Sequence, residues 1–183
     1  HELALAGTVI AVDRGRFTVA IPSQDSDASP RVIYAVKARE LGRKGIVVGD
    51  DVDLVGDLSG DIDNQARVVR RRDRVSTLRR TADDTDPVER VIVANATQLA
   101  IVTATTNPAP SFGLIDRALV AAYDAGVRPV LIVTKTDLVA PDELRRMYAP
   151  LDFEMFEVSD RRPPLALQQA LADEVTVVVG HSG

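Results

Sequence analysis

At 183 residues, with 45% apolar and 27% charged side chains, the chain is long enough for one ordinary domain or two small ones and too apolar for wholesale disorder. It has no Cys and no apolar run near the ~20 residues of a membrane span, which excludes disulfides, thiolate metal sites and a transmembrane helix in this stretch. The net charge of −5 is uneven: residues 1–80 carry a net +2 and residues 81–183 a net −7, which predicts two modules with different partners.

The first part of the chain has the pattern of a small β-barrel. Short β-rich segments fall at 8–12, 17–21, 32–36, 51–58 and 66–71. The DRGR segment at 13–16 has the composition of a hairpin turn. Five short strands without a helix predict an all-β barrel of the OB type over residues 1–75, although an SH3-like barrel fits the pattern almost as well.

The pattern changes after this barrel. Residues 76–90 contain TADDTDP, whose small, acidic and Pro-punctuated composition predicts an exposed linker. Beyond it, apolar strands are predicted at 99–103, 129–133, 153–158 and 175–179, and helices at 114–125, 141–148 and 165–172. Strands that alternate with helices indicate a parallel α/β sheet covered on both faces, here within residues 91–183.

The tetrapeptide Thr134-Lys135-Thr136-Asp137 directly follows a predicted buried strand. In such sheets, ligands bind at the carboxyl ends of the strands. The Asp137 carboxylate can accept hydrogen bonds from the N1–H and the exocyclic amine of guanine, a pair that adenine does not offer, while the Lys135 stem can lie over the base. A solvated turn is the plain alternative, but the strand before it and the helix after it favour guanine binding.

The sequence ends in a Gly-rich turn, Gly180-His181-Ser182-Gly183, that follows another apolar strand. A P-loop begins in this way, because the backbone N–H groups of its turn wrap the phosphates. Gly180 fits the first position of G-x-x-x-x-G-K-[ST], and the printed sequence stops before the second Gly and the Lys. An ordinary Gly-rich turn fits the same residues.

Ser159 is a third candidate for the same site. It follows the strand predicted at 153–158, whose carboxyl end falls on the same sheet edge as Asp137. In that position, Ser159 and the next backbone N–H could support guanine O6. A helix-capping or loop Ser fits the sequence equally well.

The base loop precedes the Gly-rich turn here, whereas ordinary GTPases have the P-loop first. A family resemblance is carried by the order and the amino-acid sequences of four stretches that together cover nearly the whole chain: GTVIAVDRGRFTV, RVSTLRRTADDTDPVERVIVANATQLAIVTA, GLIDRALVAAYDAGVRPVLIVTKTDL and VVVGHSG. With them, the chain resembles the ribosome small-subunit-dependent GTPases, a circularly permuted family that assists late maturation of the small ribosomal subunit.

The resemblance implies a multi-domain protein with an N-terminal OB barrel, a partial and circularly permuted P-loop NTPase-like GTPase domain, and a C-terminal zinc module that this sequence lacks. It implies GTP or GDP with Mg²⁺, Zn²⁺ only in the missing module, and slow GTP hydrolysis stimulated by the small subunit. The implied partners are the small ribosomal subunit, its rRNA and other assembly factors. We expect a cytoplasmic monomer without a membrane partner or a metal site in these residues.

Residue by residue, Thr134, Lys135 and Asp137 match the family's [NT]KxD guanine loop, with Thr in place of the commoner Asn. Ser159 falls near the second base-contacting loop, and residues 180–183 match the start of the P-loop. The P-loop Lys and Ser/Thr, the switch segments and the DxxG loop are missing, so no catalytic residue can be named. We expect this stretch alone to be inactive, whether it is a fragment or the ordered part of a longer chain.

Arginines are concentrated in residues 67–80, where Asp73 is the only opposing charge. Strand alternation places some of them in solvent simply to keep a sheet edge soluble. A barrel with a basic flank and few aromatic residues also fits recognition of RNA through phosphates and shape. The tie to an RNA-dependent family favours RNA, and the predicted contacts are Arg70, Arg71, Arg72 and Arg74.

Two other functions stay open on the sequence alone. One is an RNA-binding OB module fused to a Rossmann-like domain that binds a nucleotide or nothing, and the other is a scaffold that binds GTP without turnover. The sequence V-G-K-[ST] after Gly183 would favour the enzyme over the first alternative. Single-turnover hydrolysis by the full-length protein, with and without small subunits, would separate the enzyme from the scaffold.

Overall fold

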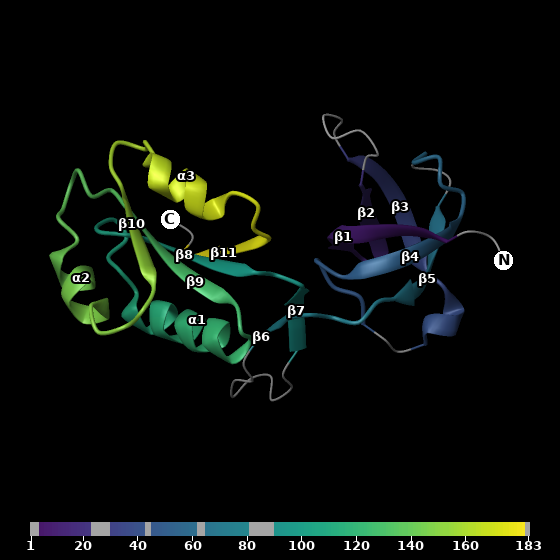
Figure 1. The fold of residues 1–183 in the computed structure, drawn as a ribbon, viewed down its shortest axis with the longest axis horizontal. Coiled ribbons are helices and arrows are strands. Elements are labelled where there is room, and N and C mark those ends of the chain that lie inside the picture. The colour runs from purple at the N-terminus through teal and green to yellow at the C-terminus, as the bar shows by residue number, and fades with distance from the viewer. Residues whose placement is uncertain (1–3, 23–29, 43–44, 62–64, 81–89, 182–183) are drawn as a thin grey trace. The chain divides into compact units, whose positions relative to one another are not determined.

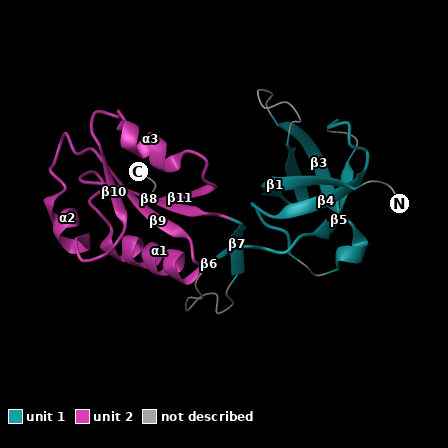
Figure 2. Ribbon diagram, in the orientation of Figure 1, with its two compact units in different colours: residues 1–95 teal, residues 96–183 magenta. Residues whose placement is uncertain are grey.

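The computed structural model describes residues 4–22, 30–42, 45–61, 65–80 and 90–181. The chain divides into two units, residues 1–95 and residues 96–183 (Figure 2). The first unit holds a closed barrel and a two-stranded ribbon, and the second holds a four-stranded sheet with helices (Figure 1). No helix in the described part of the chain is long and apolar enough to cross a membrane.

Five strands close the barrel of the first unit: β1 (Leu5–Asp13), β2 (Arg16–Ile21), β3 (Arg31–Lys37), β4 (Asp51–Gly56) and β5 (Ala66–Arg71). Their order is β1-β2-β3-β5-β4, with β4 paired back to β1. The β3–β5 pair is parallel and the other pairs are antiparallel. A short 3-10 helix, η1 (Arg39–Leu41), follows β3. The predicted barrel of five strands is therefore confirmed.

Backbone conformation explains the first turn of the barrel, and alternation along the strands explains its core. The predicted hairpin joins β1 to β2 through Arg14 and Gly15, whose φ angles of 46° and 85° are those that a two-residue type I′ turn requires. Val19, Ile33 and Leu54 are fully buried in the interior, each at 0% exposure. Successive side chains point to opposite faces of a strand, so every second residue contributes to this core.

The residues predicted as a linker, 76–90, differ from that expectation at both ends. Strand β6 (Thr77–Arg80) pairs antiparallel with β7 (Arg90–Ala94). Leu78 is buried while the next residue is exposed, an alternation that the acidic composition of the following residues obscured. That acidic stretch, 81–89, lies outside the described residues. The ribbon is joined to the barrel unit by a hydrogen bond of 2.9 Å from the N–H of Ala94 to the carbonyl of Val48.

The second unit has the predicted alternation of strands and helices. In chain order these are β8 (Gln98–Ala104), α1 (Phe112–Asp124), β9 (Arg128–Thr134), α2 (Asp142–Tyr148), β10 (Glu154–Val158), α3 (Leu165–Leu171) and β11 (Thr176–Gly180). All strand pairs are parallel and their order is β10-β9-β8-β11. The prediction of a parallel α/β sheet is therefore confirmed.

Helices cover both faces of this sheet, with α1 and α3 on opposite sides (Figure 1). Leu167 of α3 packs in one cluster with Ala100, Val130 and Ile132. The intervening residues of β8 and β9 face the other way, toward the side of α1, where Ile115 is fully buried. Burial on both faces explains why these strands are continuous apolar runs.

Candidate functional site

The four parallel strands of the second unit end at one edge of the sheet. From β8, the chain extends the sheet through β9 and β10 in one direction, and β11 then pairs with the other side of β8. The winding direction therefore reverses at the β8–β11 pair. Open α/β sheets bind their ligands outside the carboxyl ends of the strands at such a switch point.

The loop after β9 is held by hydrogen bonds to both neighbouring strands. The Thr134 hydroxyl donates to the carbonyl of Thr103 at 3.3 Å, and the N–H of Thr136 donates to the carbonyl of Val158 at 3.4 Å. Lys135 has a φ of 61°, in the left-handed region, and its carbonyl accepts from the Thr105 hydroxyl at 2.8 Å. These bonds hold the turn that leads from Thr134 to Asp137.

A pocket of about 510 Å³ lies at this edge, between the loops that follow β9 and β10. Its volume is within the range of small-molecule sites. Predicted and unpredicted residues share its lining, which consists of Thr134, Lys135, Asp137, Leu138, Val158, Asp160 and Arg161. A carboxylate at the rim and a long cationic stem are the groups expected for a guanine base.

Asp137 joins the two loops of this pocket. Its Oδ1 atom accepts a hydrogen bond of 3.0 Å from the N–H of Asp160. The carboxylate is exposed, and within the described residues its Oδ2 atom accepts no hydrogen bond. An ionised carboxylate has about four lone-pair sites, so Asp137 can hold the Asp160 loop and still accept hydrogen bonds from a ligand.

The loop after β10 makes a tight turn. Asp160 and Arg161 have φ angles of 48° and 55°, and the N–H of Arg162 donates to the carbonyl of Ser159 at 2.9 Å. Two successive residues at positive φ cost conformational energy unless Gly or Asn occupies them, so surrounding bonds must hold this turn. The bond from Asp160 to Asp137 is one of these.

A smaller cavity of about 160 Å³ adjoins the loops after β8 and β11, and His181 is one of its lining residues. Thr134 and Lys135 line both cavities. The Lys135 ammonium also donates to the carbonyl of Asn107 in the loop after β8. Lys135 therefore lines the pocket of about 510 Å³ and is also hydrogen-bonded to the loop that lines the smaller cavity.

The structure brings most of the predicted nucleotide residues to this edge. Thr134, Lys135 and Asp137 surround one pocket, and His181 follows Gly180 at the end of β11. Other candidates take different positions or are not described: Thr136 contributes its N–H to Val158, Ser159 lies between two lining residues without lining the pocket, and Ser182 and Gly183 lie outside the described residues.

Four lining residues, Leu138, Val158, Asp160 and Arg161, were not among the site residues predicted from the sequence. Arg161 lies in none of the quoted stretches, and only the approach of the loops after β9 and β10 brings it to the pocket beside Leu138. The backbone N–H after Ser159 was predicted to face guanine O6, and in this structure it donates to Asp137.

The predicted RNA-contact arginines divide into two groups. Arg74 forms a bidentate pair with Asp50 through bonds of 2.7 and 2.8 Å, and their side chains are only 14% and 0% exposed. Its hydrogen bonds to Asp50 raise the pKa of Arg74, so it stays charged. Arg71 donates to the carbonyl of Gly45 at 2.8 Å. Arg74 and Arg71 thus have structural partners inside the barrel unit.

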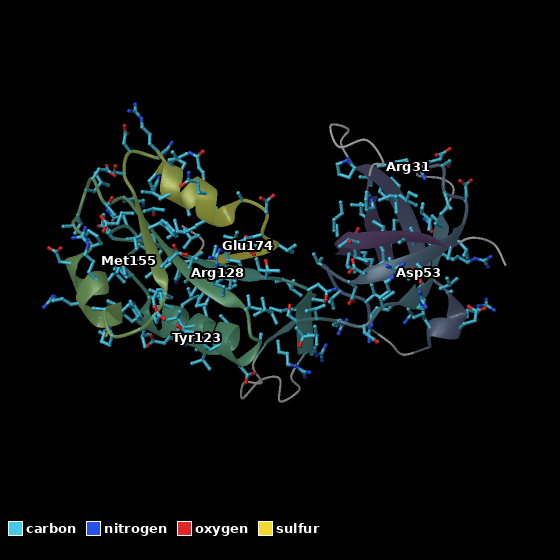
Figure 3. The ribbon with its side chains drawn as sticks, viewed as in Figure 1. Arg31, Asp53, Tyr123, Arg128, Met155 and Glu174 are labelled. Carbon is cyan, nitrogen blue, oxygen red and sulfur yellow. The ribbon has the colours of Figure 1, made fainter. Side chains whose placement is uncertain are left out.

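The other two arginines bind one carboxylate. Arg70 and Arg72 donate to different oxygens of Asp53, at 2.5 Å and at 2.7–2.9 Å. Burial alone raises the pKa of Asp53, but the hydrogen bonds and charges of these two arginines outweigh it and lower that pKa below its ordinary value of 3.8. Figure 3 marks Asp53 within the barrel.

Within the described part of the chain, no group of three or more His, Asp or Glu side chains is placed to hold a metal ion. One group of ion pairs in the second unit has a structural role: Arg128 pairs with Glu174 at 3.1 Å and with Glu154 at 3.5 Å. Arg128 and Glu174 are marked in Figure 3. These pairs lie at the start of β9 and before β11, at the end of the strands opposite to the pocket.

The fold and this edge define an α/β protein with a ligand crevice at the switch point of a parallel sheet, joined in sequence to a closed five-stranded barrel. The chain belongs to the RsgA GTPase family, whose model matches residues 71–183. The family resemblance stated from the sequence is thereby confirmed.

Named relatives agree with this membership. The chain is 30% identical to the small ribosomal subunit biogenesis GTPase RsgA of Nitrosomonas europaea, over 98% of this chain and 54% of that protein. It is 32% identical to the protein of the same name from Saccharophagus degradans, over 97% of this chain and 52% of the relative. The chain thus spans about half the length of the curated relatives that it matches.

Solved structures share the fold. The crystal structure of YjeQ from Thermotoga maritima matches 99% of this chain and 62% of its own, with a TM-score of 0.69 and 21% identity. The structure described as YloQ, a circularly permuted GTPase, matches 100% of this chain and 62% of its own, with a TM-score of 0.68 and 21% identity. At this identity the likeness concerns the fold of the two units.

Proposed function

We propose that this chain is the barrel and part of the GTPase domain of a GTP-hydrolysing protein that acts in maturation of the small ribosomal subunit. The observation that carries the proposal is the meeting of Lys135 and Asp137 with the loop after β10 around one pocket of about 510 Å³. Guanine offers two adjacent donors to a carboxylate, and Asp137 supplies a carboxylate whose Oδ2 atom accepts no hydrogen bond from the described residues. Membership of the RsgA GTPase family supports the same activity.

We propose that different residues at the sheet edge bind different parts of the nucleotide, according to their positions. Asp137 recognises the base, the Lys135 stem lies against it, and Gly180 with the residues after it approaches the phosphates. A Cβ atom at Gly180 would lie 2.8 Å from the carbonyl oxygen of Val102, so only glycine allows this approach of β11 to β8. Mg²⁺ would accompany the phosphates and supply charge neutralisation during hydrolysis.

The finer parts of the assignment belong to the same proposal. We propose that the five-stranded barrel is of the OB type and contacts rRNA, and that the GTPase domain is circularly permuted. The small subunit stimulates hydrolysis, Zn²⁺ is confined to a module outside this sequence, and the protein is a cytoplasmic monomer. The order of the loops along the chain supports the permutation, as does the similarity to YloQ, which is described as a circularly permuted GTPase.

Equilibrium titration of the full-length protein with labelled GTP, GDP and ATP tests the base assignment. We expect GTP and GDP to bind and ATP to bind at least about a hundredfold more weakly, since a site built for guanine donors leaves its polar groups unpaired with adenine. Equal affinity for ATP and GTP would contradict the guanine assignment. GTP turnover measured with and without small ribosomal subunits tests the activity, and GTP binding without turnover in both would favour a scaffold.

The 183-residue chain itself is expected to show no GTP turnover above a control without protein. Only three residues follow Gly180, so the Lys and the hydroxyl of G-x-x-x-x-G-K-[ST] are not in this polypeptide. These groups neutralise the β- and γ-phosphates and hold Mg²⁺. Measurable turnover by this polypeptide would overturn the P-loop assignment of residues 180–183.

A further inference from the structure

Asp53 is a buried carboxylate that holds two exposed guanidinium groups. The Asp53 side chain is 7% exposed, whereas those of Arg70 and Arg72 are 68% and 46% exposed. Arg70 uses its Nε atom, and Arg72 uses Nε and Nη2. A guanidinium carries five N–H donors, so both arginines keep donors for another partner after binding Asp53.

A β-bulge creates this arrangement. The β4–β5 register shifts between Asp53 and Leu54, so that Asp53 pairs with Arg70 while Leu54 pairs with Val68. The extra residue on β5, Val69, interrupts the inside–outside alternation, and Arg70 is exposed although it lies two residues after the buried Val68. Bulges commonly redirect side chains in this way at the edges of barrels and near binding sites.

The charges of the two arginine sites differ. Arg74 and Asp50 form a buried pair of one cation and one anion, which leaves no net charge for a ligand. Arg70, Arg72 and Asp53 sum to one net positive charge, and their cations are on the surface. Charge-assisted bonds from a guanidinium to phosphate are strong when the guanidinium is already oriented, because less rotamer entropy is lost on binding.

We propose that Asp53 is a positioning residue that presents Arg70 and Arg72 as an ordered pair to the phosphate backbone of RNA, while Arg74 stabilises the barrel and makes no RNA contact. The proposal rests on the proposed function in taking RNA as the partner. The proposal divides the arginine cluster by role: Arg70 and Arg72 face the RNA, and Arg74 pairs with Asp50 inside the protein.

The direction in which a single substitution changes RNA affinity tests this inference. Asp53→Asn adds one net positive charge to the surface, so a mere charge patch would bind RNA more tightly. If Asp53 positions the arginines, binding weakens instead, by about two- to tenfold, which is the cost of ordering a long side chain that is no longer held. Fluorescence anisotropy of the 183-residue chain with labelled small-subunit rRNA measures both outcomes. Unchanged or tighter binding by Asp53→Asn overturns the proposal.

Salt dependence supplies the second readout. Joint replacement of Arg70 and Arg72 by Gln should flatten the slope of log affinity against log salt by about 0.7 to 0.9 per lost phosphate contact. Arg74→Lys should leave that slope unchanged while lowering the melting temperature, and Arg117→Gln, which removes one exposed cation from α1, is the control. A slope change from Arg74→Lys, or equal changes from Arg117→Gln and from the Arg70 and Arg72 pair, overturns the proposal.

A folding control and a second variant complete the test. Circular dichroism melts identify the temperatures at which each variant is folded, and if Asp53→Asn does not fold, Arg70→Lys with Arg72→Lys replaces it. That double variant keeps the charge and loses the forked geometry, so positioning predicts weaker binding at an unchanged net charge. Wild-type chain that binds no rRNA removes this inference, while GTP binding by the full-length protein would leave the nucleotide function standing.

Discussion

Asp137 and Asp160, which lie 23 residues apart in the chain, are joined by a hydrogen bond of 3.0 Å from a backbone N–H to a carboxylate. Through this bond, the carboxylate proposed to recognise guanine also holds the turn after β10. An asparagine side chain has a carbonyl oxygen that can accept the same N–H. Replacing Asp137 by Asn therefore tests base recognition while the loop keeps its hydrogen bond.

We expect Asp137→Asn in the full-length protein to lower GTP affinity by about ten- to hundredfold, because an unmatched buried polar contact costs about 1–3 kcal/mol. Xanthine has a carbonyl in place of the exocyclic amine, so the affinity for XTP should rise as that for GTP falls. Equilibrium titration with both nucleotides measures this. Asp152→Asn, at an exposed position of the same unit, is the matched control, and parallel losses for GTP and XTP would indicate general damage.

Gly180→Ala should weaken nucleotide binding and destabilise the second unit by about 1–3 kcal/mol. The added Cβ would meet the carbonyl oxygen of Val102 at 2.8 Å and its Cβ at 3.3 Å, so the ends of β8 and β11 must separate. Gly113→Ala is the control, because its nearest contact is the end of the Arg117 side chain at 3.4 Å and alanine favours a helix. Urea unfolding of both variants is the measurement, and equal effects would contradict the close approach.

Arg74→Gln should lower the free energy of unfolding by about 3–5 kcal/mol, because it leaves a buried carboxylate without its cation. Asp50 is fully buried and also accepts the N–H of Val47 at 2.8 Å. The double variant Asp50→Asn with Arg74→Gln should recover part of this loss, since the orphaned charge is gone. Denaturant titrations of Arg74→Gln, of Asp50→Asn alone and of the double variant give the coupling energy. Additive losses would show that the pair contributes no specific stability.

The free energy of unfolding should fall at acidic pH in part because Asp53 becomes protonated. Its pKa is lower in the folded state than the ordinary value of 3.8, so the stabilisation is fully present above about pH 4 and is lost as the pH falls through the folded-state pKa. Asp53→Asn removes this term and should unfold with a shallower dependence on pH below 4. Unfolding free energies of both proteins between pH 2.5 and 7 test this expectation. Parallel curves would contradict the lowered pKa.

The strongly periodic parts of the fold were predictable because their patterns are local. Continuous apolar runs such as 99–103 indicate strands that are buried on both faces, and the position of Asp137 directly after the buried run 129–133 placed it at the sheet edge. The family resemblance likewise followed from linear stretches. Composition failed at β6, because the acidic residues that follow it in the sequence concealed a short strand in which Leu78 is buried.

By itself, the sequence determined the barrel and the α/β unit, and the position of the loop with Lys135 and Asp137, which we propose binds guanine, before the Gly-rich turn. Each of these features depends on residues close together in the chain. Only the tertiary structure decided which partners those residues meet. The bond from Asp160 to Asp137 and the two carboxylates that divide the arginines join residues 17 to 24 positions apart. Strand pairing and a β-bulge bring these groups together, and no local pattern of residues specifies that register.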